Sequence, residues 1–351
     1  MRDLGTLGGR YSMAFAINEH GQIAGTSRPG PVGSGSREVF LWDGGKMRDL
    51  GPYGWDITWQ ELNGGYCCVV VNAEGAVAWR RRWSHGNVWV GGTLTALRFA
   101  IRDMNSRGQI VGVAYSKSTG GPGRAHAVLW QNGQLRDLGI LPGYVSSDAR
   151  AINDAGIVVG ASYSANGERS AAVTWENGGI RELPTPAGLS KCSAVAVNSR
   201  GVVLGTCSGH AILWQGGRTR DLGADLEPVA LSDRDQVMGS IPPYGAFFWN
   251  GEGVRKLGSL GGNRTFANDM NDRGQIVGSS LTLHGRLHAF VWDNGVMTDI
   301  GRPGSYSTSE ALAINDRGEI VGWSQIGEPK PQGMEYSGPP SHAFLWMPTG
   351  A

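Results

Sequence analysis

The sequence predicts an all-β protein, an eight-bladed β-propeller of four-stranded blades, and three observations predict it. Glycine supplies 57 of the 351 residues and tryptophan 13, so glycine has about twice its usual share. One phrase of strand and turn residues recurs about every 42 residues, and propeller blades have this length. Helical periodicity is absent throughout the chain.

Two positions mark each repeat. A tryptophan ends an apolar strand at eight places: Trp42, Trp89, Trp130, Trp175, Trp214, Trp249, Trp292 and Trp346. A polar residue begins a tight turn at Asn18, Asn72, Asn105, Asn153, Asn198, Ser232, Asn271 and Asn315. Both sets recur with a mean spacing of about 42 residues, which predicts eight repeats.

Each repeat contains four strand segments: His-Ala-Phe-Leu-Trp, Asp-Leu-Gly, Ala-x-Ala-Ile-Asn and Gly-x-Ile-Val-Gly. The asparagine begins a type I turn, and a glycine three residues later accepts the positive φ of a bulge. We therefore expect the third and fourth segments to form a hairpin.

The two ends of the chain fit one shared blade. The sequence begins with the Asp-Leu-Gly segment at 2–5 and ends with the His-Ala-Phe-Leu-Trp segment at 342–346. Pairing them would close a ring of blades and remove the exposed strand edges. We expect a single domain over 1–351, and a linear β-solenoid is the alternative.

The full phrase resembles the bacterial HAF-repeat family, which is often described as extracellular repeats. Asp3 to Gly9 and His342 to Trp346 carry the resemblance most closely, and it covers essentially the whole chain. The resemblance implies a propeller-like fold. It implies no activity and no site residues.

The charge composition narrows the partners. With 31 basic and 30 acidic residues the chain has a net charge of +1, so we expect no nucleic-acid partner. No apolar run reaches the roughly 18 residues of a membrane span, so we expect no membrane partner. We predict a monomer that is cytoplasmic if Met1 is the native start and secreted if a leader was removed.

The second repeat, at about 49–97, departs most from the pattern. It contains an extra aromatic segment, and a tryptophan replaces the repeat glycine ahead of three arginines. Aromatic and arginine side chains bind planar, apolar or anionic ligands by stacking and bidentate hydrogen bonds. The alternative is a blade that repacks around spare tryptophans. The candidate ligand-binding residues here are Trp55, Trp59, Trp79, Arg80, Arg82 and Trp83.

A second group of candidates comes from aligning the Ala-x-Ala-Ile-Asn strands. Asp148, Glu227 and Glu310 stand five residues before the turn residue, and Arg102, Arg150 and Asn268 stand three before it. Alternation along a strand puts both positions on one side. If this strand is innermost, the side chains converge on the mouth of the central channel. They are either an acid–base site or a girdle of salt bridges.

The remaining candidates lie on the long loop at 323–341, which we expect to act as a lid and which contains Trp323 and Tyr336. The histidines that begin the Trp strands are expected to be structural. Asp103 and Asp269 replace a small residue and are expected to hydrogen-bond between blades. No metal-ligand or cofactor-binding motif is present, so we predict neither a metal nor a cofactor.

Cys192 and Cys207 flank the turn at 198–201. A turn of this kind with a glycine bulge shifts the register by one and sends the two side chains to opposite faces. We therefore expect free thiols.

Two functions remain open. The first is a cofactor-independent enzyme of the cyclase, isomerase or lyase type, which uses acid–base chemistry on a largely apolar or aromatic small molecule at the variable-loop face. The second is a non-catalytic propeller that recognises a glycan or a protein. Burial distinguishes them, because an enzyme needs an enclosed carboxylate.

Overall fold

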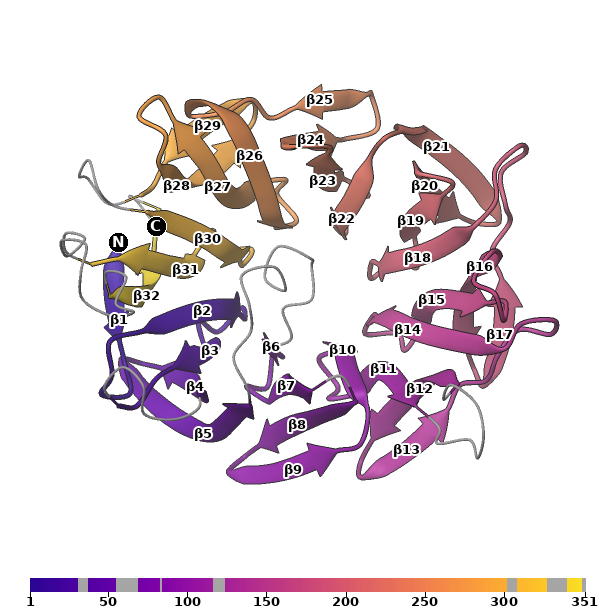
Figure 1. Cartoon of the computed structure of the whole chain (residues 1–351), viewed down its shortest axis with the longest axis horizontal. Coiled ribbons are helices and arrows are strands. Elements are labelled where there is room, and N and C mark those ends of the chain that lie inside the picture. The colour runs from indigo at the N-terminus through magenta and orange to yellow at the C-terminus, as the bar shows by residue number, and fades with distance from the viewer. Residues whose placement is uncertain are drawn as a thin grey trace. The chain divides into compact units, whose positions relative to one another are not determined.

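The computed structural model describes residues 1–30, 37–54, 69–82, 84–115, 124–301, 308–326 and 340–348. These residues form strands and no helix, in eight four-stranded antiparallel sheets. Figure 1 shows the sheets with their strand labels. The prediction of an eight-bladed β-propeller is confirmed. The described residues hold no helix that is long and apolar enough to cross a membrane.

The chain divides into two compact units, which we describe separately. The first comprises Met1–Val77, Pro243–Phe248 and Arg255–Ala351, and the second Ala78–Pro242 and Trp249–Val254.

Three sheets lie wholly within the first unit. In sheet order their strands are β2 (Ser12–Ile17), β3 (Ile23–Ser27), β4 (Arg37–Asp43) and β5 (Lys46–Gly54); β26 (Gly261–Met270), β27 (Ile276–Thr282), β28 (Leu287–Asp293) and β29 (Val296–Asp299); and β30 (Ser309–Ile314), β31 (Ile320–Gln325), β32 (Ser341–Trp346) and β1 (Arg2–Gly5).

Three further sheets lie wholly within the second unit. Their strands are β10 (Ala100–Met104), β11 (Ile110–Tyr115), β12 (Ala125–Gln131) and β13 (Gln134–Asp137); β14 (Ser146–Ile152), β15 (Val158–Tyr163), β16 (Ser170–Glu176) and β17 (Gly179–Glu182); and β18 (Cys192–Val197), β19 (Val203–Cys207), β20 (His210–Gln215) and β21 (Arg218–Ala224).

The last two sheets complete the eight. One consists of β6 (Val69–Val71), β7 (Val77–Arg82), β8 (His85–Val90) and β9 (Thr93–Leu97), and the other of β22 (Glu227–Leu231), β23 (Val237–Ile241), β24 (Gly245–Trp249) and β25 (Val254–Lys256). The short β6 belongs to the second repeat, where the sequence departs from the pattern.

The order of strands within a sheet differs from the order of segments within a repeat, because each sheet begins two segments later. The Ala-x-Ala-Ile-Asn strand is the first of each sheet and the Asp-Leu-Gly strand the last. The blade shared between the termini is confirmed, because β1 pairs with β32 and completes the sheet that begins at β30.

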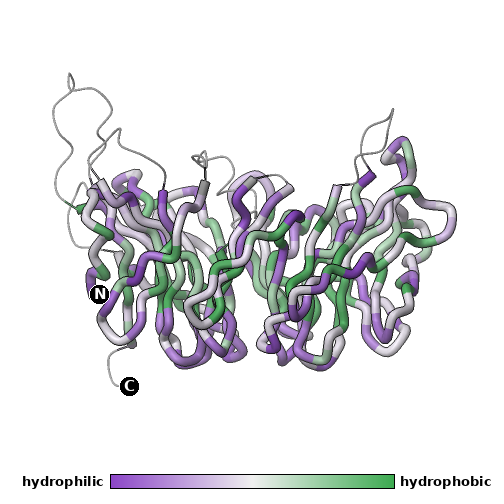
Figure 2. The backbone as a smooth tube through the Cα atoms, turned by 90° about the horizontal axis from the view of Figure 1, so that it is seen from below, coloured by the Kyte–Doolittle hydropathy of each residue, from purple (hydrophilic) through white to green (hydrophobic). Residues whose placement is uncertain are grey.

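The core consists of thin apolar layers, one of which joins Val159 and Ala172 of one sheet to Ile212 and Trp214 of the next. The repeat tryptophans Trp42, Trp175 and Trp214 belong to such layers, and Trp214 is only 2% exposed. In Figure 2 hydrophobic residues follow the strands and hydrophilic ones the turns. A core divided in this way explains how 351 residues fold without one large hydrophobic centre.

The turn asparagines join successive sheets within each unit. The Asn153 side-chain oxygen accepts the Ile157 backbone N–H at 2.9 Å, and its Nδ2 donates to the Asn198 carbonyl of the next sheet, also at 2.9 Å. The same bond between sheets is donated by Asn18, Asn271 and Asn315 in the first unit and by Asn105 and Asn198 in the second. This position needs one acceptor and one donor, and asparagine supplies both.

A bulge in the first strand explains the repeat glycine. In the sheet that begins at β14, the register shifts between Ala149 and Ala151. A Cβ on Gly160 would lie 1.9 Å from the Asp148 carbonyl oxygen, so only glycine fits there. The same close approach occurs at Gly25, Gly112, Gly205, Gly278 and Gly322.

The expectation of free thiols at Cys192 and Cys207 is wrong, because the two form a disulfide. The turn shifts the register by one residue, as expected. The bulge between Ala194 and Ala196 shifts it back, so Cys192 pairs directly with Cys207. The prediction included the first shift and missed the second.

Candidate functional site

The aligned polar residues occupy the first strands of their sheets. Asp148 lies on β14, Glu227 on β22 and Glu310 on β30, each near the strand end opposite the Asn turn. Asp148 and Glu310 are partly buried, whereas Glu227 is exposed. The three positions are equivalent in the repeat but differ in their surroundings.

In the second unit Asp148 lies between two arginines. Its Oδ2 is 3.5 Å from Arg102 Nη2, on the neighbouring strand β10, and 3.5 Å from Arg150 Nε. Arg150 also donates to the Tyr163 hydroxyl at 2.9 Å. The side chains of Asp148 and Arg102 are 14% and 19% exposed. This arrangement is a cluster of salt bridges between two sheets, with one negative and two positive charges.

In the first unit Glu310 has neutral partners instead. Asn268 on β26 donates to Oε1 at 3.1 Å, and its Nδ2 also lies 2.8 Å from the Ala311 carbonyl oxygen. Trp323 Nε1 donates to Oε2 at 3.2 Å. Burial raises the pKa of Glu310 above its usual range, and the hydrogen bonds from Asn268 and Trp323 lower it by less.

The two clusters have the same geometry within the repeat. A residue three positions before the turn, Arg102 or Asn268, reaches the residue five positions before the turn on the next sheet, Asp148 or Glu310. Where the residue three positions before the turn is Arg102, its positive charge compensates the negative charge of Asp148. Where that residue is Asn268, the amide carries no charge, and burial raises the pKa of the Glu310 carboxyl group. Glu310 is therefore the better candidate for a proton donor.

Trp323 does not begin a loop. Strand β31 continues to Gln325, and the Trp323 indole is 5% exposed and bonded to Glu310. The described contact of the Trp323 indole is thus its hydrogen bond to the Glu310 carboxyl group. Tyr336, on the predicted lid, lies outside the described residues.

The candidates of the second repeat are described only in part. Trp79 on β7 is fully buried, and Arg80 beside it is half-buried. Trp55, Trp59, Trp83 and the side chain of Arg82 lie outside the described residues.

Four of the five repeat histidines bind the aspartate of the Asp-Leu-Gly strand, which agrees with the structural role expected of them, whereas His85 contacts the Ser84 hydroxyl. His126 Nδ1 lies 2.7 Å from Asp137 Oδ2, and the Asp137 Oδ1 accepts the Gly139 N–H at 2.8 Å. The same pairing occurs in His210–Asp221, His288–Asp299 and His342–Asp3. In the described residues no three His, Cys, Asp or Glu side chains are placed to hold a metal ion.

The prediction that Asp103 and Asp269 hydrogen-bond between blades is confirmed. Asp103 accepts the Ile152 N–H and Asp269 the Ile314 N–H, each on the next sheet at 2.9 Å. Burial raises the pKa of Asp269 to about 6, while the backbone hydrogen bonds from Ile314 and Met270 oppose this. The pKa of Asp103 is raised for the same reason.

Sequence reasoning missed an aromatic cluster in the first unit. The Arg264 guanidinium lies 4.2 Å from the centre of the Tyr244 ring, and Tyr244 meets Phe266 edge to face at 6.5 Å. Tyr244 is 44% exposed. Phe266 is equivalent to Glu310 in the repeat, and this substitution was the one available signal.

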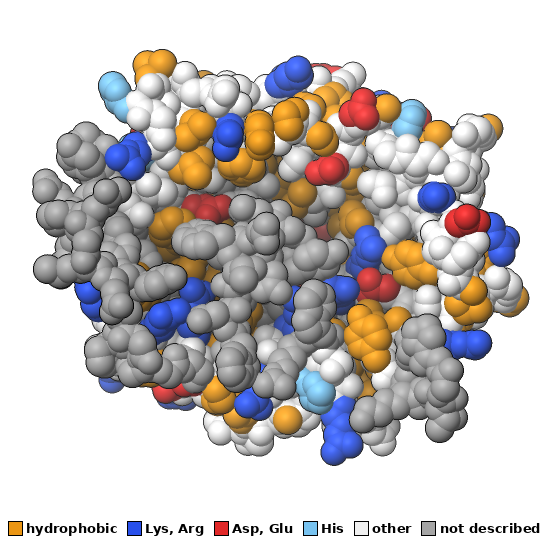
Figure 3. Space-filling model, viewed as in Figure 1, with side chains coloured by type: hydrophobic (Ala, Val, Ile, Leu, Met, Phe, Trp, Pro, Cys, Tyr) orange, Lys and Arg blue, Asp and Glu red, His pale blue; other side chains and the backbone are white. Residues whose placement is uncertain are grey.

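On the face in Figure 3, the Lys and Arg side chains of the described residues are interspersed with Asp, Glu and hydrophobic side chains. This distribution agrees with the net charge of +1.

The fold and these clusters define a β-propeller with polar contacts between neighbouring first strands. Comparisons with protein-family models and with curated proteins find no match. Solved structures are similar in fold.

A computationally designed protein, Ika8, is 20% identical with a TM-score of 0.58, and the match covers 99% of this chain and 100% of that one. The β-propeller domain of the Trilobed protease from Pyrococcus furiosus is 12% identical with a TM-score of 0.51, over 83% of this chain and 98% of that one. An oligogalacturonate lyase from Vibrio parahaemolyticus is 11% identical with a TM-score of 0.51, over 83% and 92%. These identities support the fold alone.

Proposed function

We propose that the chain is a small-molecule-binding β-propeller that acts as a cofactor-independent acid–base enzyme, with Glu310 as the proton donor. The observation that carries the proposal is a partly buried carboxyl group held by two neutral donors, with a raised pKa. Such a group stays protonated at a higher pH than an ordinary glutamate and can donate its proton to a substrate.

The neighbours of Glu310 fix the orientation of its carboxyl group. Asn268 and Trp323 each bind one carboxyl oxygen, so the group cannot rotate without losing a hydrogen bond. Both are positioning residues in this proposal. Elimination, isomerisation and cyclisation all need a directed proton transfer and no cofactor. The propeller fold of an oligogalacturonate lyase supports the elimination class as one compatible chemistry.

The test compares the wild type with Glu310→Gln, which keeps the shape and loses the acid. Both proteins are incubated with small-molecule extracts and with oligogalacturonides, and the products are followed by mass spectrometry. Elimination splits a compound into two products, and isomerisation or cyclisation changes its retention time at constant mass. We expect conversion by the wild type and by the exposed control Glu168→Gln, and loss of at least a hundredfold in Glu310→Gln.

The pH dependence gives a second readout. Because the acid must carry its proton, the rate falls as the pH rises through the raised pKa of Glu310. Asn268→Ala removes a hydrogen bond that lowers this pKa, so the fall moves to higher pH. Equal turnover by Glu310→Gln would refute the role of Glu310.

The second candidate is recognition of a glycan without catalysis. The exposed Tyr244 with Arg264 and Phe266 favours it, because sugars stack on aromatic rings. Oligosaccharide binding that Tyr244→Ala abolishes, with no conversion by the wild type, would favour recognition over the enzyme.

We also propose that the chain belongs to the HAF-repeat family, because its repeat phrase resembles that of the family. We propose an oxidising compartment, because disulfides such as Cys192–Cys207 persist there.

A further inference from the structure

A cluster of two aromatic rings and one arginine lies on the strand that carries Asn268, the partner of Glu310. The Tyr244 ring lies 4.2 Å from the Arg264 guanidinium and meets Phe266 edge to face at 6.5 Å. Arg264, Phe266 and Asn268 follow one another at intervals of two residues along β26. The cluster and Glu310 both belong to the first unit. The strand therefore leads from the aromatic cluster to the proposed proton donor.

The backbone holds Tyr244 against β26. The Thr265 N–H, between the two β26 residues of the cluster, donates to the Tyr244 carbonyl at 2.9 Å. The Thr265 side chain is buried, and its Oγ1 donates to the Gly258 carbonyl at 2.7 Å. Tyr244 itself is exposed and Phe266 is half-buried. A ligand can therefore reach both rings, which a fixed backbone holds in place.

The Arg264 guanidinium has N–H donors for a further partner. The Tyr244 ring covers one side of the group, whereas the N–H donors of a guanidinium lie in its own plane. Arg264 is exposed, and its side chain makes no hydrogen bond or ion pair with any residue that the structure describes. A carboxylate can accept two such N–H groups at once. The cluster thus combines one uncompensated positive charge with two apolar rings.

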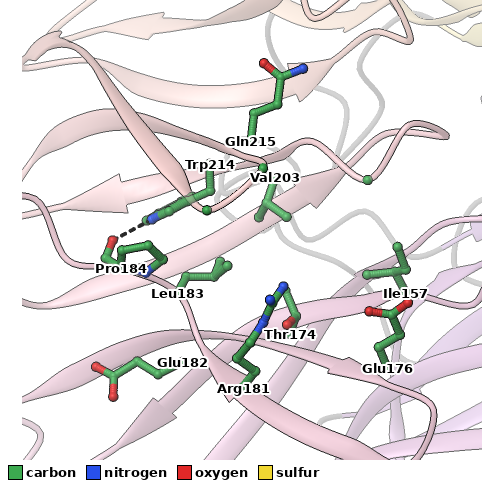
Figure 4. A pocket seen from close by; sticks show the side chains of 13 residues that line it. Ile157, Thr174, Glu176, Arg181, Glu182, Leu183, Pro184, Val203, Trp214 and Gln215 are labelled. Carbon is green, nitrogen blue, oxygen red and sulfur yellow. Dashed lines mark hydrogen bonds between the residues drawn. The ribbon is translucent and has the colours of Figure 1, made fainter.

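A cavity in the second unit shows a different balance of charge. It measures about 300 Å³ and lies between the sheets of β14–β17 and β18–β21 (Figure 4). Arg181 pairs with Thr174 across β16 and β17, and Glu176 follows Thr174 by two residues, so the guanidinium and the carboxylate share one face. The chain supplies a carboxylate on the face of Arg181, and among the described residues it supplies none to Arg264.

The spacing along β26 indicates the size of a ligand. Phe266 occupies the repeat position of Glu310, five residues before the turn residue, and Arg264 lies two residues nearer the loop end. Two residues of a strand span about 7 Å. This span is comparable to the length of one six-membered ring with its carboxylate. A ligand whose carboxylate binds Arg264 can therefore place its ring on Phe266 and extend toward the Glu310 carboxyl group.

We propose that this cluster binds a small aromatic carboxylate. The carboxylate accepts from Arg264, and the ring packs against Tyr244 and Phe266. An aromatic ring suits the cluster better than a sugar does, because sugar hydroxyls need hydrogen-bond partners and the Asn268 amide already donates to Glu310. That the bound compound is also the substrate rests on the proposed function of Glu310, whereas its binding at Arg264 does not.

Calorimetric titration of the full chain with benzoate tests the site. We expect saturable binding by the wild type and binding at least tenfold weaker in Arg264→Gln, which loses the charge-assisted hydrogen bonds. The matched control is Arg169→Gln, because Arg169 also lies over a tyrosine ring, that of Tyr144 at 5.4 Å, but in the second unit. The control should bind benzoate as the wild type does. Benzamide, which has the same shape and no charge, and acetate, which has no ring, should each bind at least tenfold more weakly than benzoate.

Glu310→Gln separates the binding site from the proposed enzyme. It should bind benzoate at least as tightly as the wild type, because it removes a negative charge and keeps Arg264. Benzoate binding that depends on Arg264, in a wild type that converts no compound, would support the site and refute the enzyme. Absent benzoate binding, equal affinity in Arg264→Gln, or equal affinity for benzamide would overturn the site even where turnover depends on Glu310. Binding of glucuronate without benzoate binding would overturn the choice of an aromatic ring.

Discussion

Asp269 makes the stability of the first unit depend on pH in a direction that can be calculated. Its carboxyl group is buried, and its pKa rises from the ordinary 3.8 to about 6. An acid with a raised pKa binds its proton more tightly in the folded state. Its protonation therefore stabilises the fold fully below about pH 3.8, and this stabilisation is lost as the pH rises to about 6.

The size of the effect follows from the shift. Roughly two pH units correspond to about 3 kcal/mol of unfolding free energy. Asp269→Asn removes the titrating group and keeps an oxygen that accepts the Ile314 N–H. The wild type should therefore lose about 3 kcal/mol relative to this variant between about pH 4 and about pH 7.

Urea unfolding at a series of pH values measures this difference, with tryptophan fluorescence as the signal. Taking the difference between the two proteins cancels the contributions of Asp103 and of the other acids. The exposed Asp43→Asn serves as the control and should follow the wild type at every pH. A difference between wild type and Asp269→Asn that stays constant with pH would refute the reasoning.

Three further predictions concern the scaffold. Serine at both Cys192 and Cys207 should lower the unfolding free energy by about 3 kcal/mol in urea, the chain-entropy value for the 15-residue separation, and the unreduced wild type should show no free thiol at these positions by mass spectrometry. Asn153→Ala should cost about 2–4 kcal/mol through two buried hydrogen bonds, and Asn153→Asp less, because it keeps the acceptor and loses the donor; denaturant midpoints would rank the variants. Gly160→Ala should cost about 2 kcal/mol or more because its Cβ meets a carbonyl at 1.9 Å, whereas Gly253→Ala, with no atom within 4 Å, should melt close to the wild type in calorimetry.

The sequence was sufficient to predict the fold because the same pattern of strand and turn residues recurs eight times. A single Trp or Asn-x-x-Gly is a weak signal, but eight tryptophans and seven Asn-x-x-Gly turns with a mean period of about 42 residues favour a propeller. Contacts between sheets were harder to predict. The turn role of Asn153 is local and was predicted, whereas its bond to Asn198 depends on how two sheets pack and was not.

The disulfide shows where pattern reasoning failed. Face alternation depends on every one-residue shift, and the bulge between Ala194 and Ala196 has no residue signature of its own. The histidine pairing did have a signal, since His126–Asp137 and His210–Asp221 share a separation of eleven residues, while His85 has Ala96 at that distance.

The candidate site was predictable in its positions and unpredictable in its chemistry. Alignment of the first strands placed Asp148 with Arg102, and Glu310 with Asn268, on one side of their strands, and the structure brings both pairs into contact. Burial and the identity of the partner then decide what each carboxyl can do. Neither property follows from a strand pattern.

Two kinds of buried carboxyl group result, and they should be separated by their partners. Asp269 accepts backbone N–H groups of its own strand and of the next sheet, so its oxygens serve the packing of two sheets. Glu310 accepts from two side chains, Asn268 and Trp323, near the loop end of its strand. A structural carboxyl group that joins two sheets needs backbone donors, and Asp269 has them. The side-chain donors of Glu310, Asn268 and Trp323, are additions to the repeat. The difference argues that the raised pKa of Asp269 is a cost of packing, and it supports the proposal that the Glu310 carboxyl group transfers a proton.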